Sequence, residues 1–449
     1  MFKMVKVRFA PSPTGYLHIG NARAALINYL FTKKHKGSFL LRIDDTDMER
    51  SEKKYEDAIF EDLKWLGIDY DETFHQSHRF DRYEIIKNKL IASGDLYPCY
   101  DTKEELEFKR KRSLSQKKPP IYDRSALRLT TAQINDFEQQ GRRPHYRFLL
   151  KDRSIVWNDG IKGTIEFHGK DLSDPVLIRE DGVFLYSFCS VIDDIDFGIT
   201  HIIRGEDHVT NTATQIQMFE ALRGPVPEFS HTTLLLDKDG GALSKRLGSL
   251  SLRDLRDKGI EPLVINSLLC RLGTSLPMHQ SYSMEELIND FDLSHFTCTA
   301  PKFNDQDLAR MNEKYFHHVP FSHMVHHLNN DGIHFTPDEF DIIKKNVVSF
   351  NDFKVWFSIL KSPIKHPEMS LEDQDFLKIA IQLLPKEFSK NTWRLWTGSL
   401  SEHTQRKGYA LYHPLRLALT GLDNGPKLED IFLLLTHKQV LDRLHGGLH

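Results

Sequence analysis

The chain has 449 residues, of which 40% are apolar and 27% charged, and its formal net charge is −3. This length allows two to four domains with sizeable cores, and the composition is that of an ordinary globular protein. No stretch approaches the length of a membrane-spanning helix, and the first residues contain no apolar secretory core, so the sequence predicts a cytoplasmic protein. The net charge excludes a chain that binds nucleic acid through overall positive charge.

The first seventy residues predict a βαβ unit. Val5–Phe9 alternates like a strand, and the turn segment Ala10–Gly15 leads into a helix that ends before Gly37. One apolar face of that helix is expected to contain Ala22, Ala25, Leu26, Tyr29 and Leu30. A second strand, Phe39–Ile43, then runs into four residues that include three aspartates, 44–47. Because parallel sheets bind ligands beyond the carboxyl ends of their strands, residues 11–21 and 44–47 are candidates for a binding site.

The loop before the helix resembles a nucleotide cradle, although it has neither a Walker nor a dinucleotide motif. His18 and Gly20 lie at the helix N-terminus, where free backbone N–H groups and the helix dipole favour phosphate. His18 would donate a hydrogen bond to a phosphate oxygen, and Gly20 would leave room for a base or ribose.

These residues carry a family resemblance. Arg8–Asn21 resembles the first signature of class I aminoacyl-tRNA synthetases, in the Pro-Ser-Pro-Thr-Gly form of bacterial glutamyl enzymes. Further blocks are similar to the family in the same order along the chain: Leu41–Asp47, Leu63–Asp69, Val191–Asp194, Gly198–His208, Leu243–Arg246, Phe303–Asn312 and Tyr412–Gly421. The resemblance therefore spans nearly the whole chain.

The resemblance implies an α/β Rossmann-like catalytic domain with an α+β insertion, followed by a mainly α-helical anticodon-binding region. The expected parts are residues 1–93 and 186–255 for the two halves of the catalytic domain, 94–185 for the insertion that grips the tRNA acceptor arm, 256–302 for a helical connecting region, and 303–449 for the anticodon-binding region. Clustered cations in the insertion are either a solvated face or phosphate contacts: Lys109–Arg112, Lys117, Lys118, Arg142 and Arg143.

The implied activity is that of a glutamate–tRNA ligase. Such an enzyme activates glutamate with ATP and Mg²⁺ to glutamyl-adenylate. It then transfers the glutamyl group to the 3′-terminal adenosine of tRNA(Glu); tRNA(Gln) is an additional or alternative acceptor. Activation in this family needs bound tRNA. The partners are thus glutamate and a tRNA held at its acceptor arm and anticodon, and the protein is expected to be a monomer.

The resemblance also implies roles for particular residues. Catalysis is assigned to His18 and to Lys245 of the second signature. The other expected ATP-binding residues are Gly20, Glu206, Leu243 and Ser244. The expected glutamate-binding residues are Arg8, Ser12, Asp44, Tyr186, Ser190 and Arg204. Among these, Arg8 would hold the side-chain carboxylate in a bidentate manner and Asp44 would face the ammonium group.

The chain departs from its relatives at four places. Many relatives carry a cysteine-rich zinc site in the insertion, but here Cys99 is alone and Asp101 takes the next position, so no zinc or other protein-held metal is expected. Ala242 replaces a basic residue of the second signature. Asp44 and Ser190 stand where glutamate and asparagine are common in the pocket. The four scattered cysteines are expected to be reduced and mostly buried.

Three other functions would account for part of the sequence. A small-molecule nucleotidylyltransferase shares the loop, but it would need neither Arg8 nor the C-terminal blocks. A truncated paralogue that glutamylates a modified tRNA base lacks the C-terminal part. A non-catalytic tRNA-binding paralogue would be compatible with Ala242, but both His18 and Lys245 are present.

Overall fold

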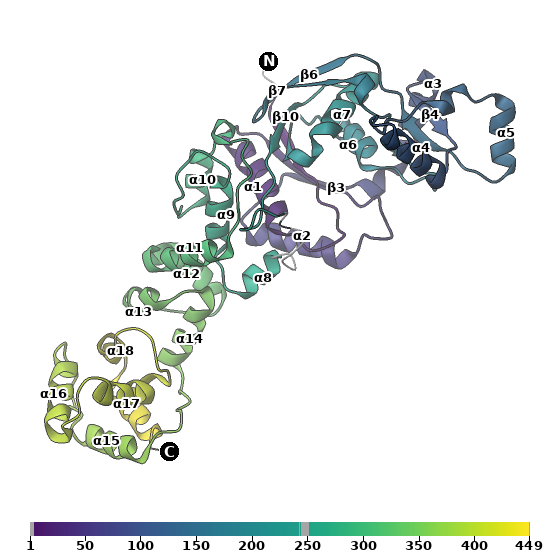
Figure 1. Cartoon of the computed structure of the whole chain (residues 1–449). Helices are drawn as coiled ribbons and strands as arrows, with labels where there is room; N and C mark the ends of the chain where they lie inside the picture. Colours follow the sequence, from purple (N-terminus) through teal and green to yellow (C-terminus); the bar gives the residue numbers. More distant parts are fainter. Residues whose placement is uncertain (1–3, 242, 244–250, 449) are drawn as a thin grey trace. The chain divides into compact units, whose positions relative to one another are not determined.

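The computed structural model describes residues 4–241, 243 and 251–448. The chain divides into two compact units, residues 1–255 with 265–304 and residues 256–264 with 305–449. The first unit contains the strands and the second is built from helices (Figure 1).

The centre of the first unit is a layer of parallel strands. Strands β1 (Lys6–Phe9), β2 (Ser38–Ile43) and β3 (Glu72–His75) form one ladder, and β9 (His201–Gly205) pairs with β10 (Glu228–Thr232). The two ladders lie side by side because β1 contacts β9, where the Thr200 N–H donates to the Lys6 carbonyl over 2.9 Å. The resulting order, β3-β2-β1-β9-β10, contains the βαβ unit predicted from the sequence.

In the described part of the chain, five helices lie between or beside these strands. They are α1 (Ile19–Lys34), α2 (Lys53–Trp65), α3 (Phe80–Ser93), α6 (Tyr186–Asp196) and α7 (Val209–Ala221), with short 3₁₀ turns at Gln76–Arg79 and Glu206–His208. The prediction of a single apolar face on α1 was too narrow. Arg23, Ile27, Asn28 and Phe31 are buried as well, so the helix is enclosed on most sides.

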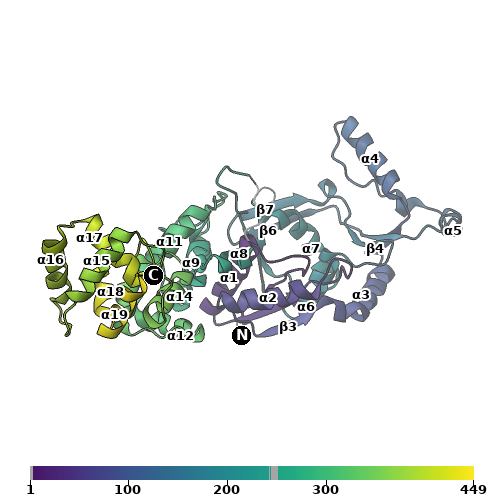
Figure 2. The same ribbon diagram turned by 90° about the horizontal axis from the view of Figure 1, so that it is seen from below.

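The inserted segment lies between the two halves of the layer. Strands β4 (Leu96–Cys99), β5 (His145–Phe148) and β8 (Val176–Ile178) form an antiparallel sheet, and β6 (Ser154–Asp159) with β7 (Gly163–His168) forms a hairpin. The inserted segment also contains helices α4 (Lys103–Ser115) and α5 (Thr131–Gln139), and α5 is its part farthest from α1 in both views (Figures 1 and 2). Helix α4 buries none of its side chains, so much of its surface is open to a partner.

The rest of the chain is helical. Helices α8 (Leu252–Asp257) and α9 (Pro262–Arg271) cross the unit boundaries, and α10 (Met284–Asp290) and a 3₁₀ turn at Leu293–His295 belong to the first unit. The second unit contains α11 (Asp305–His318), α12 (Phe321–Asn330), α13 (Pro337–Ile343), a 3₁₀ turn at Lys344–Asn346, α14 (Phe350–Lys361), α15 (Leu371–Gln382), α16 (Thr392–Thr404), α17 (Tyr409–Thr420), α18 (Leu428–Leu434) and α19 (His437–Gly446).

Aromatic side chains dominate the interior of the second unit. Phe316, Phe340, Phe353, Trp396 and Phe432 are buried there. Leu415 and Leu419 of α17 are fully enclosed as well. Among the described residues, no helix combines the length and apolar character that crossing a bilayer needs.

Candidate active site

A cavity of about 630 Å³ opens at the carboxyl ends of β1, β2 and β9. Its wall includes seven of the residues predicted for the site: Arg8, Ser12, His18, Gly20, Asp44, Tyr186 and Arg204. They come from segments far apart in the sequence, and the parallel strands bring them together because these strands end at one edge of the layer.

His18 begins helix α1 and serves as its N-terminal cap. The Nδ1 atom of its imidazole accepts a hydrogen bond from the Gly20 N–H at 3.0 Å, and its own backbone N–H donates to the side chain of Asn21 at 3.2 Å. Burial lowers the pKa of the His18 imidazole. A neutral ring that accepts at Nδ1 carries its proton at Nε2, so His18 offers an N–H donor to the cavity.

Gly20 is needed for this arrangement. A Cβ atom at position 20 would lie 2.9 Å from Cε1 and 3.1 Å from Nδ1 of His18. Besides the room for a ligand expected from the sequence, Gly20 therefore lets the imidazole fold back onto the helix N-terminus.

Buried ion pairs form the base of the cavity. The Arg8 Nε–H donates to Asp194 at 3.2 Å, and Arg42 donates to Asp194 from Nη1 at 3.0 Å and to Asp44 from Nε at 2.6 Å. Arg42 is completely buried, and these contacts satisfy its charge. Burial, opposed by the Arg42 charge, raises the pKa of Asp44 to about 6. Ser190 lies beneath the cavity wall, where its hydroxyl accepts from Arg42 at 2.8 Å.

Arg204 reaches the cavity wall from the end of β9. Its Nη1 donates to the Tyr186 hydroxyl at 3.0 Å, and Tyr186 also lies against the ring of His208. Burial lowers the pKa of the Arg204 guanidinium.

The remaining predicted ATP-binding residues are not part of the described cavity wall. Glu206 accepts from the Lys162 ammonium at 2.6 Å and from the Leu234 N–H at 3.2 Å, outside the described cavity wall. Leu243 is also absent from the described part of that wall. Ser244 and Lys245 lie outside the described residues, as does Ala242. Just beyond this stretch, Ser251 forms an antiparallel bridge with His18.

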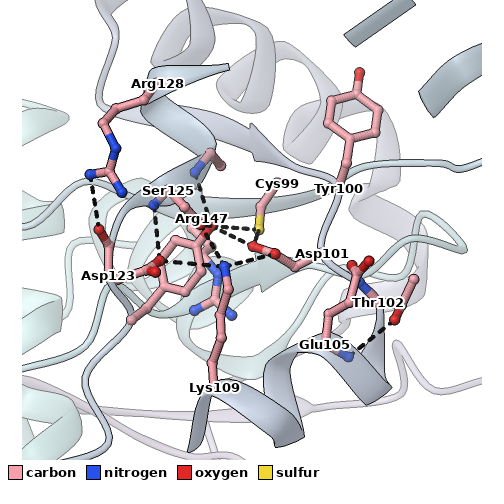
Figure 3. Close-up of polar contacts among 12 residues, drawn as sticks. Cys99, Tyr100, Asp101, Thr102, Glu105, Lys109, Asp123, Ser125, Arg128 and Arg147 are labelled. Carbon is pink, nitrogen blue, oxygen red and sulfur yellow. Dashed lines mark hydrogen bonds and ion pairs between the residues drawn. The ribbon is translucent and has the colours of Figure 1, made fainter. Parts of the chain in front are cut away.

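A polar cluster surrounds Cys99 and Asp101 in the inserted segment (Figure 3). The Cys99 thiol lies 3.3 Å from Asp101 and 3.2 Å from the Tyr122 hydroxyl. The Lys109 ammonium donates to Asp101 at 2.8 Å and to Ser125 at 2.6 Å. Its positive charge therefore balances the Asp101 carboxylate within the cluster. Within the described ranges, no group of three or more His, Cys, Asp or Glu side chains could hold a metal ion.

The same contacts divide the cationic residues of the insertion. Lys109 is occupied by the cluster, and Arg142 pairs with Glu105 at 3.1 Å. Of the cations predicted to cluster, those that remain exposed are Arg110, Lys111, Arg112, Lys117, Lys118 and Arg143. All four cysteines are free thiols, and three of them are buried, as predicted.

Sequence reasoning assigned no role to Arg42 or to Asp194, which together join Arg8 to Asp44. One signal was available, since a charged residue in the apolar strand β2 has to find a buried partner. The partner itself is 152 residues away in the chain and could not be chosen from the pattern.

Comparison with known proteins agrees with this architecture. Residues 4–310 match the family model "tRNA synthetases class I (E and Q), catalytic domain", and residues 340–448 match "Anticodon binding domain". The sheet, its cavity and the helical second unit are thus those of a class I tRNA synthetase.

Similar proteins indicate which amino acid this class I synthetase uses. The chain is 47% identical to glutamate–tRNA ligase 1 of Maricaulis maris over 99% of both chains, and 47% identical to glutamate–tRNA ligase 2 of Rickettsia canadensis over 98% of this chain and 100% of that protein. The crystal structure of a glutamate tRNA ligase from Elizabethkingia meningosepticum, in complex with its amino acid, covers 99% of each chain with a TM-score of 0.80 and 26% identity. The chain belongs to the glutamate–tRNA ligase family, whose substrates are ATP, glutamate and tRNA.

Proposed function

We propose that the cavity at the sheet edge first activates glutamate as glutamyl-adenylate and then transfers the glutamyl group to the 3′-terminal adenosine of tRNA(Glu). The main support is that seven residues predicted from separate motifs line one cavity of about 630 Å³. Transfer to tRNA(Gln) is a second possibility that the experiment below decides.

In the first step, an oxygen of the α-carboxylate attacks the α-phosphorus of ATP. A carbon–oxygen–phosphorus bond forms, the bond to the β-phosphate breaks, and pyrophosphate leaves. The carboxylate is already ionised at neutral pH, so no general base is needed. The site has to align the reactants and surround the crowded phosphorus with positive charge and hydrogen-bond donors.

The glutamate end of the cavity has complementary groups. Arg8 uses Nε for Asp194, while its two Nη nitrogens have no hydrogen-bond partner among the described residues. This free fork suits the bidentate grip on the side-chain carboxylate that the sequence suggested. Asp44, ionised above pH 6, would face the ammonium group, and Arg204 with Tyr186 and Ser12 would complete the wall.

The nucleotide end would be served by the two signatures. The Nε2–H of His18 and the N-terminus of α1 would bind phosphate oxygens. Lys245 would bind the departing phosphates, with help from Ser244 and Leu243. In support of this, Ser251, six positions after Lys245, forms a β-bridge with His18. Glu206, held by Lys162, would lie near the adenosine.

Magnesium is proposed to arrive with ATP. The acidic group at the glutamate end, Asp44, is already engaged by Arg42, and the described residues offer no cluster of metal ligands. The ion would therefore be held by the triphosphate rather than by a protein cage.

The tRNA would contact three of the parts expected from the sequence. We propose that the insertion, residues 94–185, binds the acceptor arm through the exposed cations near α4, and that residues 256–302 and 303–449 contact the stem and the anticodon. The enzyme is proposed to act as a monomer, which sedimentation in the presence and absence of tRNA would test.

The test is charging of purified tRNA(Glu) and tRNA(Gln) with labelled glutamate. We expect charging of tRNA(Glu), and none of tRNA that lacks its terminal adenosine. Lys245→Ala should lower the rate about a hundredfold, because one lost donor to developing charge costs about 3 kcal/mol. The control is Lys238→Ala, which changes an exposed lysine of the same segment and should keep the rate. An unchanged rate for Lys245→Ala would refute the assigned role, and no charging by the unmodified enzyme would refute the function.

A further inference from the structure

Arg204 is a buried cation without a counter-charge. Its side chain is 7% exposed, yet no carboxylate of the described residues lies within 4.0 Å of its guanidinium. Arg8 and Arg42, the other two buried arginines at this end of the cavity, both pair with aspartates. Arg23, Arg147 and Arg443 are also buried, and they donate to backbone carbonyls. Arg204 differs from them because it lines the cavity and its main acceptors are neutral side chains.

Neutral acceptors surround Arg204 instead. Its Nη2 donates to the Gln215 amide oxygen and to the Thr212 hydroxyl, both at 2.7 Å, and its Nε donates to His231 Nε2 at 3.4 Å. With the bond from Nη1 to Tyr186, four of the five N–H groups of a guanidinium are used. One N–H of Nη1 and the whole positive charge remain for a ligand.

Burial lowers the pKa of the His231 imidazole and the Arg204 charge adds to this effect, while the bond to Asp159 opposes it, so the ring is neutral. Asp159, at the end of β6, accepts from Nδ1 of the ring and from the His231 backbone N–H. Burial opposes ionisation of Asp159, but these bonds outweigh it and lower its pKa to about 2. With the ring proton held at Nδ1, Nε2 presents a lone pair to Arg204. The inserted segment thus helps to orient the arginine of the pocket.

The charges at this end of the cavity favour one substrate. Arg8, Arg42 and Arg204 carry three positive charges, against two negative charges on Asp44 and Asp194. A third buried carboxylate, Asp193, lies 4.0 Å from Arg42 but is paired more closely with Arg79, at 2.7 Å. A fourth cation, Arg23, has its electrostatic partner Glu206 at the nucleotide end. Glutamate brings a net charge of −1 and balances the site, whereas glutamine is neutral and leaves it unbalanced.

We infer that the neutral acceptors Thr212, Gln215 and His231 are specificity-positioning residues, which hold Arg204 in place without neutralising it and so make the pocket require a substrate with a net negative charge. Gln215 is the decisive member. A glutamate there would have the same shape and would give Arg204 an internal partner, yet the chain carries the uncharged amide. The inference rests on the proposed placement of glutamate in this cavity.

The experiment compares Gln215→Glu with the unmodified enzyme in charging of tRNA(Glu), with glutamate and with glutamine as the amino acid. The added carboxylate should occupy Arg204 and oppose the substrate charge. We expect KM for glutamate to rise at least about tenfold, equivalent to about 1.4 kcal/mol. The preference for glutamate over glutamine should fall by a similar factor, while KM for ATP changes less than about twofold.

The matched control is Gln217→Glu on the same helix. Gln217 is also buried, but its amide bonds to the backbone of Lys151, away from the cavity. This variant should keep both KM for glutamate and the amino-acid preference. Folding of each variant is followed by thermal melting.

The neutral variant Gln215→Met separates charge from hydrogen bonding and serves if Gln215→Glu does not fold. It removes an acceptor without adding charge, so the preference for glutamate should stay within about threefold of the unmodified value. Loss of preference in Gln215→Met, or unchanged KM for glutamate in folded Gln215→Glu, would overturn the inference. In either case the unmodified enzyme would still charge tRNA with glutamate, whereas failure of the proposed function would abolish that reaction.

Discussion

Replacing Gly20 by alanine should separate activity from stability. The added Cβ would lie 2.9 Å from Cε1 of His18, so the imidazole has to move and its bond from the Gly20 N–H, now 3.0 Å, is lost. Alanine in a helix gains about 1 kcal/mol over glycine, and the lost cap costs about 1 kcal/mol. The free energy of unfolding should therefore change little.

The effect on catalysis should be large. If the displaced ring no longer aims Nε2–H at the phosphates, the loss of one preorganised donor costs about 3 kcal/mol, on the order of a hundredfold in kcat/KM. ATP–pyrophosphate exchange measures this, with tRNA present because the family resemblance implies that activation needs it. His18→Asn should lose activity to a similar extent while keeping the helix cap, since asparagine is also a good capping residue.

Gly398→Ala is the matched control. Gly398 lies inside α16, and an added Cβ would meet nothing within 4 Å. This variant should gain about 0.5–1 kcal/mol of stability and keep full activity. Two results would show that the imidazole position does not limit the reaction. One is an ATP–pyrophosphate exchange rate of Gly20→Ala equal to that of the unmodified enzyme, and the other is a loss of activity accompanied by a marked fall in the melting temperature.

Two further predictions concern the pH response and the insertion. Because burial raises the pKa of Asp44 to about 6, kcat/KM for glutamate at saturating ATP should fall about tenfold per unit as the pH drops below 6, and Asp44→Asn should remove this dependence. The folded pKa lies above the ordinary value of 3.8, so ionisation of Asp44 destabilises the fold as the pH rises from 4 to 6; acidification through this range should therefore not lower the melting temperature through this group, and parallel unfolding would contradict the explanation. Lys109→Met should cost the insertion about 1 kcal/mol by removing the cation of the Asp101 cluster, seen as faster proteolysis of α4 with KM for glutamate unchanged. Lys111→Met, on an exposed part of the same helix, should have no such effect, and a chelator should leave the proteolysis of unmodified enzyme unchanged; sensitivity to the chelator would instead indicate a bound metal.

Short-range features were predictable from the sequence. The alternation of Val5–Phe9, the turn before His18 and the helix signal after it depend on residues close together in the chain, and β1, α1 and β2 form there. The location of the cavity followed as well, because parallel strands expose their carboxyl ends at one edge. Seven of the predicted site residues line the cavity for this reason.

Long-range partners were decided only by the tertiary structure. Nothing in the local pattern around Arg42 selects Asp194, and nothing around Gln215 indicates that its amide lies 2.7 Å from Arg204. The enclosure of α1 on most sides was missed for the same reason, since burial depends on which elements pack around a helix. The sequence determined the chemical groups and the edge of the sheet where they meet. The packing of α6 and α7 against the strands decided which arginine is paired with a carboxylate and which is held by neutral groups, because in a buried site the free energy of a charge depends on the few atoms in direct contact with it.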